Sequence, residues 1–582
     1  MSTAPHHPAA PADGGSAVAG LERLLGTAAD PGNPTGSRAV LAADERQEPL
    51  AAGEQLLDRY GLAAHVVPES LGGRLTRLDQ LIDVMRTVYR RDPALGLARG
   101  AGPFMAAVNV WTAGRPEQRA HLARALLSGS TAACAYHELA QGNDLGRAGV
   151  TALPAPPPDT ALLLNGRKEV IANLRRADTV VLFARTGRAS GSRSHSQLLL
   201  DTAALPADRV RHLDRFRTTG MRGVPLGGVE FTDCPVPADS VIGAPGLGLE
   251  TALRSFQLTR IALPGMTAGL LDSAIRTALR CATGRPLYGR TAADLPLSRT
   301  LLAESFADLL LADAFLTVAA RAAHTAPART AIPSSAVKAL VPRILMSAVH
   351  RLSQLMGSQF YLRTGEHALF QKLLRDGLPS SFGHASRASC LAGLLPQLPL
   401  VARRTWTNPG AEPLPAATFR LADPLPPLRF DALAVTASGR DPLARSLTSG
   451  PASHAPDGTP EGDIGAAARS RTAELAALAA DCRDLRPEHL APTAPAHGFA
   501  LAERWTGILA ASACIGLWHH HDTGGPLADP VWVLAALHRL DAHQGRHRDH
   551  LPPHLTEPLY AELVRREAAG RTFDLGCHPT GA

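Results

Sequence analysis

The spacing of hydrophobic positions changes along the 582-residue chain, and the first region has a helical period. In residues 21–133, apolar side chains such as Leu81, Val84 and Val88 recur at the three- and four-residue spacing of a helix with one buried face. The segment Val67–Gly73 interrupts this pattern with a proline and paired glycines, which predict a turn. We therefore expect an N-terminal helical domain over 21–133.

The second region, residues 134–244, contains short apolar runs bounded by Pro, Gly and Ser. The runs at 161–164, 180–183 and 197–200 are typical of buried strands. Asn165–Gly166 follows the first run and predicts a β-hairpin turn, because this dipeptide accepts the required positive φ angles. The sequence therefore predicts a compact middle β domain.

Helical patterns return in the third region, residues 245–405. Leu302, Phe306, Leu309 and Phe315 form a wide apolar stripe, which indicates a helix buried within a bundle. A parallel α/β sheet would alternate strands and helices throughout, whereas this chain has helices, then strands, then helices.

Three further segments complete the expected organisation. Residues 1–20 are rich in Ala, Pro and His without a basic-then-apolar order, which favours a disordered arm over a secretion signal. Residues 406–465 are dominated by Pro, Gly, Ser and Ala and are predicted to form a linker with some ordered pieces. Residues 466–582 are predicted to form an extra helical domain.

Composition narrows the partners and the compartment. The net charge of +7 is spread along the chain, and no Lys/Arg block with interleaved aromatic residues is present, so we expect no nucleic-acid partner. A diffuse positive bias suits a phosphorylated thioester carrier better. Seven widely spaced cysteines without a CxxC pair favour reduced thiols in a cytoplasmic protein. No apolar run reaches about 18 residues, so no transmembrane segment is expected.

The histidine-rich segments do not predict a metal site. Adjacent residues in His519–Asp522 cannot all face one ion, and no HExxH or CxxC frame accompanies them. His543, His547 and His550 have nearly helical spacing, but the Arg and Asp residues around them indicate a solvated face. We therefore expect no metal.

Seven segments, in order over about residues 40–404, resemble motifs of the acyl-CoA dehydrogenase and oxidase superfamily. Each one is short, but their order matches the predicted layout of helices and strands. The chain is identified as a divergent bacterial member with a C-terminal helical extension. The segments are Val67–Gly73 (VPESLGG), His137–Asp144 (HELAQGND), Asn165–Asn173 (NGRKEVIAN), Gly220–Gly223 with Val229–Pro237, Arg285–Gly289 (RPLYG), Gln354–Gly357, and Arg375–Asp376.

The resemblance implies an α+β fold of the acyl-CoA dehydrogenase type, with an N-terminal helical domain, a middle β-barrel-like domain and a C-terminal four-helix bundle, plus the extra C-terminal helical domain. It also implies bound FAD. A planar guanidinium offers paired donors to a pyrophosphate, so Arg285 is expected to reach the diphosphate of a neighbouring subunit's flavin. By resemblance the cofactor-binding residues are Glu138, Leu139, Gly142, Asn143, Asp144, Ile171, Ala172, Arg285, Tyr288, Gln354 and Gly357, and the substrate-binding residues are Arg222, Thr259 and Arg260.

Simpler structural roles remain open for several of these residues. Arg285 at a helix end and Gln354 on a helix surface are also compatible with solvent exposure, and Asn143 and Asp144 are common turn residues. The chain also departs from the family pattern near the flavin. Val170 replaces the usual tryptophan, and Ala172 replaces a threonine whose hydroxyl lies beside the flavin edge.

The largest departure concerns the base that removes the α-proton of the thioester. Most members carry a glutamate nine residues after the Arg of the RD pair, and counting from Arg375 reaches His384. A subgroup places the acid on an earlier helix, where this chain has Thr259. An imidazole with a pKa near 6.5 is partly neutral at cell pH and can act as a base. The alternative is a structural histidine beside a flexible glycine.

The leading hypothesis is FAD-dependent α,β-dehydrogenation of an acyl thioester, with His384 as base, in lipid or natural-product biosynthesis. Expected partners are acyl-CoA or an acyl-carrier protein, and an electron-transfer flavoprotein or oxygen as electron acceptor. A homo-dimer or tetramer is expected. Two alternatives stay open: other flavin chemistry on the same fold, such as an oxygenase or desulfinase, and a base-less subunit that pairs with a second dehydrogenase.

Overall fold

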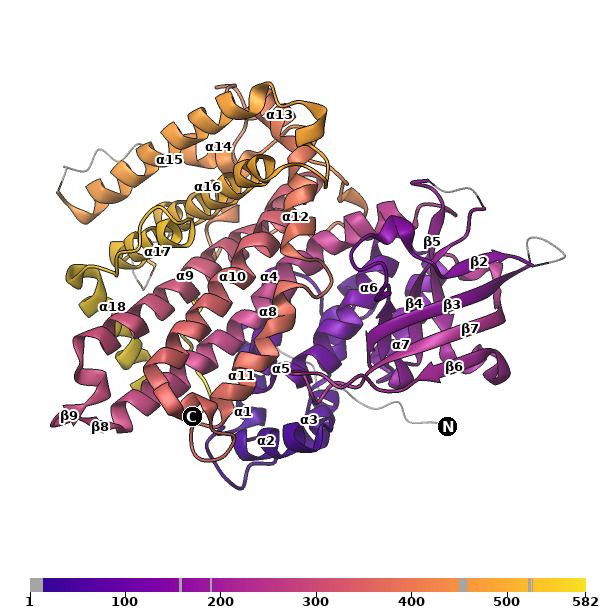
Figure 1. The fold of residues 1–582 in the computed structure, drawn as a ribbon, viewed down its shortest axis with the longest axis horizontal. Coiled ribbons are helices and arrows are strands. Elements are labelled where there is room, and N and C mark those ends of the chain that lie inside the picture. The colour runs from indigo at the N-terminus through magenta and orange to yellow at the C-terminus, as the bar shows by residue number, and fades with distance from the viewer. Residues whose placement is uncertain are drawn as a thin grey trace. The chain divides into compact units, whose positions relative to one another are not determined.

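The computed structural model describes residues 14–155, 160–188, 191–449, 458–521, 525 and 527–581. The chain divides into two compact units (Figure 1). Unit 1 comprises Met1–Thr76, Gln80–Ser255 and His578–Ala582, and unit 2 comprises Arg77–Asp79 and Phe256–Cys577.

The helices of unit 1 precede its sheet along the chain. The first begins at Gly14, so residues 14–20, which we expected within a disordered arm, are helical; residues 1–13 lie outside the described part. The predicted helix over 80–89 is confirmed as part of α4. The longer helices are α1 (Gly14–Leu25), α2 (Ser37–Arg46), α3 (Ala51–Tyr60), α4 (Leu78–Arg91), α6 (Gly102–Ala113) and α7 (Pro116–Leu127).

The sheet of unit 1 has seven strands in the order β1-β4-β2-β3-β7-β6, with β5 paired to β4. The three predicted apolar runs lie in β3, β4 and β5. The β3–β7 and β4–β5 pairs are antiparallel, and β1 runs parallel to β4. The strands are β1 (Ala132–Ala135), β2 (Thr151–Pro154), β3 (Ala161–Ala172), β4 (Thr179–Arg185), β5 (His195–Asp201), β6 (Val210–Leu213) and β7 (Leu226–Pro237).

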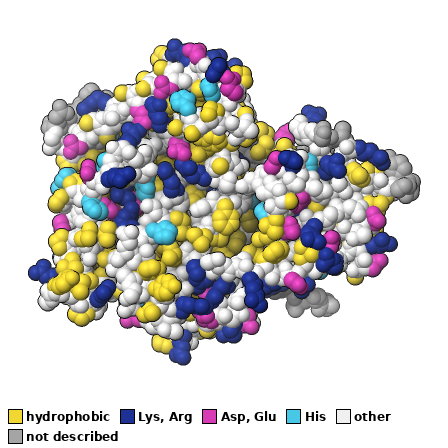
Figure 2. All heavy atoms as spheres, viewed as in Figure 1, with side chains coloured by type: hydrophobic (Ala, Val, Ile, Leu, Met, Phe, Trp, Pro, Cys, Tyr) yellow, Lys and Arg dark blue, Asp and Glu magenta, His cyan; other side chains and the backbone are white. Residues whose placement is uncertain are grey.

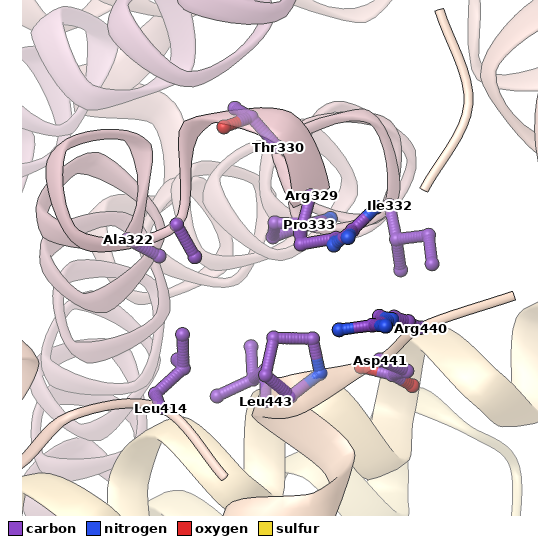
Figure 3. A pocket seen from close by; sticks show the side chains of 11 residues that line it. Ala322, Arg329, Thr330, Ile332, Pro333, Leu414, Arg440, Asp441 and Leu443 are labelled. Atoms are coloured by element: carbon purple, nitrogen blue, oxygen red, sulfur yellow. The ribbon is translucent and has the colours of Figure 1, made fainter. Parts of the chain in front are cut away.

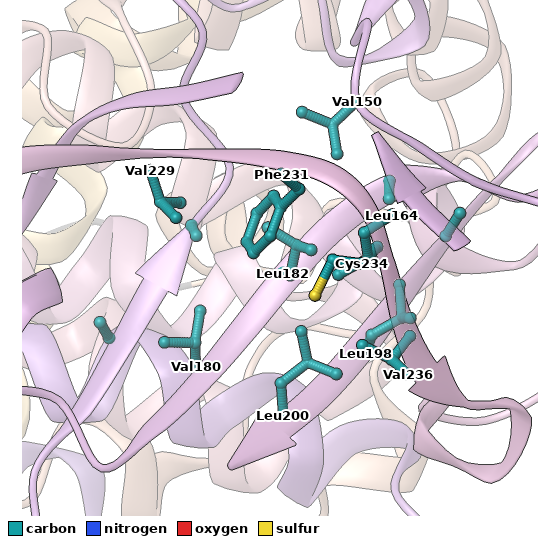
Figure 4. Close-up of a cluster of buried hydrophobic side chains, with 14 of the residues drawn as sticks. Val150, Leu164, Val180, Leu182, Leu198, Leu200, Val229, Phe231, Cys234 and Val236 are labelled. Carbon is teal, nitrogen blue, oxygen red and sulfur yellow. The ribbon is translucent and has the colours of Figure 1, made fainter. Parts of the chain in front are cut away.

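One face of this sheet forms the core of the β domain. Alternate residues point to the same face of a strand, so Val180 and Leu182 of β4 are buried together with Leu198 and Leu200 of β5 (Figure 4). Strand β3 contributes Leu164 to the same cluster. The continuous apolar run of β4 is buried on both faces, since Val181 and Phe183 are also fully buried but lie outside this cluster.

The predicted hairpin turn at Asn165–Gly166 is wrong. Strand β3 continues through both residues and pairs with β7 on either side of them. The register shows a bulge in β7, and Asn165 spans it by donating to the Asp233 carboxylate at 3.0 Å and accepting from the Asp233 backbone N–H at 2.9 Å. Gly166 (φ +114°) lies against the backbone of Val150, where a side chain would be crowded. The positive φ serves a bulge rather than a turn.

Unit 2 is built of helices with one small hairpin. Helix α10 combines length and mean hydropathy in the range of a membrane span, but 89% of that window is buried inside the protein. This is the behaviour of a core helix. The elements are α8 (Gly248–Gly284, in unit 2 from Phe256), β8 (Pro286–Leu287), β9 (Arg290–Thr291), α9 (Pro296–Thr325), α10 (Ala331–Met356), α11 (Leu369–Gly377), α12 (Arg387–Leu394), α13 (Leu398–Val401), α14 (Pro442–Ser449), α15 (Pro460–Arg483), α16 (Ala496–His520), α17 (Pro530–His543) and α18 (Pro553–Ala568).

The described part of the expected linker, residues 406–449, is packed against the helices of unit 2. Arg321 of α9 is fully buried and donates to the backbone carbonyls of Ala417 at 2.7 Å and Thr418 at 3.0 Å. Figure 3 shows Leu414 and Leu443 facing α9 and the start of α10. The gap between them is about 10 Å³, room for roughly one water. The Pro- and Ala-rich composition does not reveal these backbone anchors.

A buried ionic group joins α17 to α9 and α10; we call it the matched group. Asp308 of α9 is fully buried and accepts from Arg351 at 2.8 Å, Arg539 at 3.0 Å and His543 at 2.9 Å. Glu304, one turn earlier, pairs with Arg351 at 3.1 Å. His543, expected on a solvated face, is therefore an internal ion-pair partner.

The remaining histidines show no metal arrangement. His520 stacks on Phe419 with ring centroids 5.3 Å apart, and Asp522 lies outside the described residues. Within the described ranges, no three His, Cys, Asp or Glu side chains are grouped so as to hold a metal ion. Figure 2 shows Lys and Arg side chains interspersed with Asp and Glu on the visible face.

Candidate active site

His384 lies in unit 2 on the segment between α11 and α12. Its backbone is left-handed, with φ +67°, after Gly383. The imidazole rests on the ring of Phe256, with ring centroids 3.9 Å apart. Phe256 and Thr259 are three residues apart on α8 and lie on the same side of that helix. The His384 ring, which contacts Phe256, therefore packs on the side of α8 that carries Thr259, the alternative position of the acid.

The His384 ring is held without hydrogen bonds at Nε2. This nitrogen is buried and has no hydrogen-bond partner in the part of the chain that the structure describes. Burial, together with the charges of Lys338 and Arg260, lowers the pKa of His384 to about 3. The imidazole is therefore neutral at pH 7, with a weaker basicity than the ordinary histidine that the sequence suggested.

Two cationic side chains surround this position. Lys338 of α10 is 2% exposed and donates to the carbonyl of Ser380 at 2.7 Å. Burial lowers its pKa to about 8. Arg260 of α8 donates to the hydroxyl of Ser335 at 3.3 Å, and its Nε is buried without a partner among the described residues.

Thr259 is fully buried, and its hydroxyl donates to the carbonyl of Phe256 at 3.1 Å. The hydroxyl is thus engaged with its own helix and is no base. The sequence pointed to His384, Thr259 and Arg260 as candidates and did not point to Lys338 or Phe256, which act on or contact His384 in the structure. A lysine inside the apolar run Ala336–Val341 was the available signal for Lys338.

A second group in unit 2 joins the end of α8 to the end of α10. Arg285 donates to the carbonyl of Met356 at 3.4 Å and lies beside Gly357. Gly357 ends α10 with φ +57° and ψ −136°, a conformation open to glycine. Gln354, on the last turn of α10, is exposed. The structure thus brings Arg285, Gln354 and Gly357 together.

Tyr288 extends from the same region. It forms the tip of the β8–β9 hairpin with Gly289, and both residues have positive φ, as a type I′ turn requires. Its side chain is 85% exposed. The guanidinium of Arg285 makes one long backbone contact, so most of its donors remain available to a ligand.

In unit 1, the loop after β1 presents backbone rather than charge. Leu139, Gly142, Asn143 and Asp144 are exposed, and Gly142 has φ +55°. Glu138 differs, since its carboxylate is taken up internally. It accepts from Lys168 at 2.6 Å and from the backbone of Gly149 and Val150. Glu138 therefore positions the loop and has no carboxylate oxygen free for a cofactor.

The end of β3 adjoins this loop, because Glu169 accepts from the backbone of Leu139 at 3.1 Å. A bulge gives Val170 φ +57°, which is rare for a β-branched residue and typical of strained functional segments. The side chain of Ile171 is 3% exposed within the sheet core and cannot contact a cofactor. Ala172 packs on the other side, against Met221.

Arg222 is already paired. It donates to Asp44 at 2.8 Å and lies 3.5 Å from Glu45, so its charge is matched by carboxylates of α2. The expected substrate-binding role of Arg222 has no free charge to support it.

Comparison with known proteins agrees with this arrangement. The family model for the acyl-CoA dehydrogenase C-terminal domain matches residues 246–383. The human mitochondrial short-chain specific acyl-CoA dehydrogenase is 28% identical over 257 residues, which cover 44% of this chain and 60% of that enzyme. Residues 246–383 of this chain match the acyl-CoA dehydrogenase C-terminal domain, and the chain is similar to members of the acyl-CoA dehydrogenase superfamily. The chain therefore spans less than two thirds of this relative's length.

Solved structures of the superfamily extend the match in fold. An acyl-CoA dehydrogenase from Bacillus anthracis, complexed with FAD, has a TM-score of 0.64 and 16% identity, and the match covers 95% of this chain and 91% of that one. Butyryl-CoA dehydrogenase from Megasphaera elsdenii has a TM-score of 0.59 and 18% identity, covering 67% of this chain and 98% of that one. The expected α+β superfamily fold with extra C-terminal helices is confirmed.

Proposed function

We propose that this chain catalyses FAD-dependent α,β-dehydrogenation of an acyl thioester, with His384 as the group that accepts the α-proton. One observation carries the proposal. A neutral imidazole lies on Phe256, with a buried Nε2 that has no hydrogen-bond partner among the described residues, at the position where the motif spacing places the catalytic acid of similar enzymes. When bound, FAD supplies the acceptor for the β-hydride.

The donor set fits FAD. Arg285 retains free guanidinium donors for a diphosphate, and Gly357 lies beside it with a backbone that no side chain crowds. Tyr288 extends from the same hairpin. In unit 1, the exposed loop from Leu139 to Asp144 is the segment that the resemblance assigns to the flavin, but the backbone N–H groups of Leu139, Gly142 and Asp144 already donate within the protein. Ala172 leaves the flavin edge without the side-chain hydroxyl usual at this position.

The proposed role of His384 depends on its own charge and on the positive charges of Arg260 and Lys338. The proton leaves the α-carbon and is taken up at Nε2 of His384, which is neutral and has no competing hydrogen bond. Its low basicity is a cost, because Arg260 and Lys338 oppose the positive charge that forms on the ring. The arrangement therefore favours substrates that offset these two cations.

The partners that we propose are acyl-CoA or an acyl-carrier protein as the thioester, and an electron-transfer flavoprotein or oxygen as the electron acceptor. A homo-oligomer is supported by large apolar side chains exposed on unit 2, including Tyr288 at 85%, Tyr361 at 80% and Leu297 at 58%. Aromatic residues are enriched in the buried parts of interfaces.

A second candidate is flavin chemistry without proton abstraction, such as an oxygenase reaction. The low pKa of His384 favours it, since a weak base contributes little to removing an α-proton.

The test is anaerobic mixing of the FAD-loaded protein with butyryl-, octanoyl- and palmitoyl-CoA, followed by flavin bleaching. The rate for His384→Ala should fall by about 10²–10⁴. Adding Thr259→Glu to that variant restores a carboxylate at the alternative family position and should recover much of the rate. His538→Ala removes another histidine with an unpaired ring nitrogen and serves as the control. Near-normal bleaching of His384→Ala would exclude the base role and favour the second candidate.

A further inference from the structure

Arg260 and Lys338 stand out because their charges are uncompensated. Within the described residues neither forms an ion pair: Lys338 meets a backbone carbonyl, and Arg260 meets a hydroxyl. Lys338 is 2% exposed, so water does not solvate its charge. A buried cation without a counter-ion is unfavourable, and proteins normally pair or neutralise such groups.

In the part of the chain that the structure describes, no carboxylate is among the groups that shift the pKa of His384 or Lys338. The charged groups that act on His384 are Lys338 and Arg260, and those that act on Lys338 are Arg260 and the thiol of Cys390. An acidic side chain at position 259 or 384 would supply the missing negative charge, and this chain has threonine and histidine there. We call Arg260, Lys338 and His384 the unmatched group, because its positive charge has no carboxylate partner among the described residues.

We propose that Arg260 and Lys338 bind a carboxylate carried on the acyl chain of the substrate, so that the substrate is a dicarboxylic thioester. The inference rests on the proposed function and names its substrate class. A carboxylate has two oxygens, which can accept from the guanidinium and the ammonium together. A second carboxyl on the acyl chain is therefore the chemistry that completes this group.

Binding of the carboxylate also has a catalytic consequence. Its negative charge offsets the two cations that oppose protonation of His384, so the imidazole becomes a stronger base when this substrate is bound. The α-proton then passes to Nε2 of His384, bound FAD would supply the acceptor for the β-hydride, and the carboxylate itself is unchanged. Neutral acyl chains leave the cations in place and His384 weak.

The experiment measures binding separately from turnover. Dissociation constants of succinyl-, glutaryl- and adipyl-CoA are compared, by calorimetry on the FAD-loaded protein, with those of butyryl-, valeryl- and hexanoyl-CoA, which match them in length. We expect at least one dicarboxylic thioester to bind about tenfold or more tightly than its neutral match. Lys338→Met should abolish this preference, Lys338→Arg should keep it, and Arg343→Met, which removes a charge from the same helix, should leave it intact.

Three outcomes separate this inference from the proposed function. Preference without flavin bleaching supports the carboxylate site and removes the dehydrogenase function. Bleaching by neutral thioesters without any carboxylate preference supports the function and overturns the site. A preference that survives in both Lys338→Met and Arg260→Met also overturns the site. Thermal melting of each variant confirms folding, and Lys338→Arg provides a second variant if Lys338→Met is poorly folded.

Discussion

The matched group and the unmatched group are both buried in unit 2, and they differ in charge balance. In the matched group, Asp308 and Glu304 face Arg351, Arg539 and His543, so each carboxylate has cationic partners. Burial raises the pKa of Asp308, but the neighbouring His543, Arg539 and Arg351 together hold it far below its usual range. In the unmatched group two cations share no carboxylate among the described residues.

The difference separates two uses of buried charge. A balanced network connects helices, because removing one member leaves the others buried and unpaired. A surplus of one sign is expensive in the empty protein and becomes favourable when a ligand supplies the opposite charge. The matched group joins α9, α10 and α17, whereas the unmatched group surrounds His384. We therefore expect stability to depend on the first and ligand selection on the second.

The largest effect is expected from Asp308→Ala. This change leaves Arg539, His543 and Arg351 without their shared carboxylate, and breaking a buried pair in this way costs about 3–5 kcal/mol in the free energy of unfolding. Denaturant unfolding measures it. The control is Glu557→Ala, which removes a 55% exposed partner of Arg299 and should change stability by less than about 0.5 kcal/mol. A loss below about 1 kcal/mol for Asp308→Ala would contradict the structural role of the matched group.

Removing positive charge from the unmatched group should raise the free energy of unfolding, whereas Asp308→Ala should lower it. Burial lowers the pKa of Lys338 from 10.5 to about 8, so between pH 8 and 10.5 the unfolded chain holds a proton that the folded chain has released. The free energy of unfolding should therefore rise with pH across this window, and below pH 8 the charged lysine should cost roughly 3 kcal/mol at most.

Lys338→Met removes this cost. At pH 7 the variant should be more stable than the parent protein, and the difference should shrink between pH 8 and 10.5. Thermal or denaturant unfolding at several pH values measures both. The variant Lys338→Arg keeps the charge and should show no gain. A Lys338→Met protein that is less stable than the parent at pH 7 would show that Lys338 is compensated in solution.

The contrast between the two groups also marks how far the sequence could predict this molecule. The helical period was sufficient for helices such as α4, because burial of one helix face enforces a period of 3.6, and short apolar runs bounded by Pro, Gly and Ser were sufficient for strands β3, β4 and β5. The hairpin prediction failed at Asn165–Gly166, where the same backbone preference serves a bulge across from Asp233. At residues 406–449, Arg321 holds backbone carbonyls of Ala417 and Thr418, a contact that the composition of the segment does not reveal.

At the site, motif spacing named His384, Thr259 and Arg260 as candidates, and the charge of Arg260 acts on the His384 imidazole. Spacing carries no information on charge balance. The low basicity of His384 depends on Lys338, which lies 46 positions earlier in the chain and approaches through packing of α10. Likewise, Glu138 and Arg222 matched family motifs, but their partners Lys168 and Asp44 had to be seen in three dimensions.

The smallest effect on stability is expected from Arg285→Ala. This variant also tests whether ligand binding can be changed without changing the stability of the fold. Arg285 belongs to neither buried group and makes one backbone contact of 3.4 Å, so its loss should change the free energy of unfolding by less than about 0.5 kcal/mol. Flavin retention should fall, because a diphosphate would lose a bidentate cation. The ratio of flavin to protein absorbance after gel filtration measures this. The matched control is Arg280→Ala, which removes an arginine of α8 that pairs with Glu567. This variant should retain flavin. Equal flavin retention in the two variants would remove Arg285 from the flavin site while leaving the comparison of the buried groups intact.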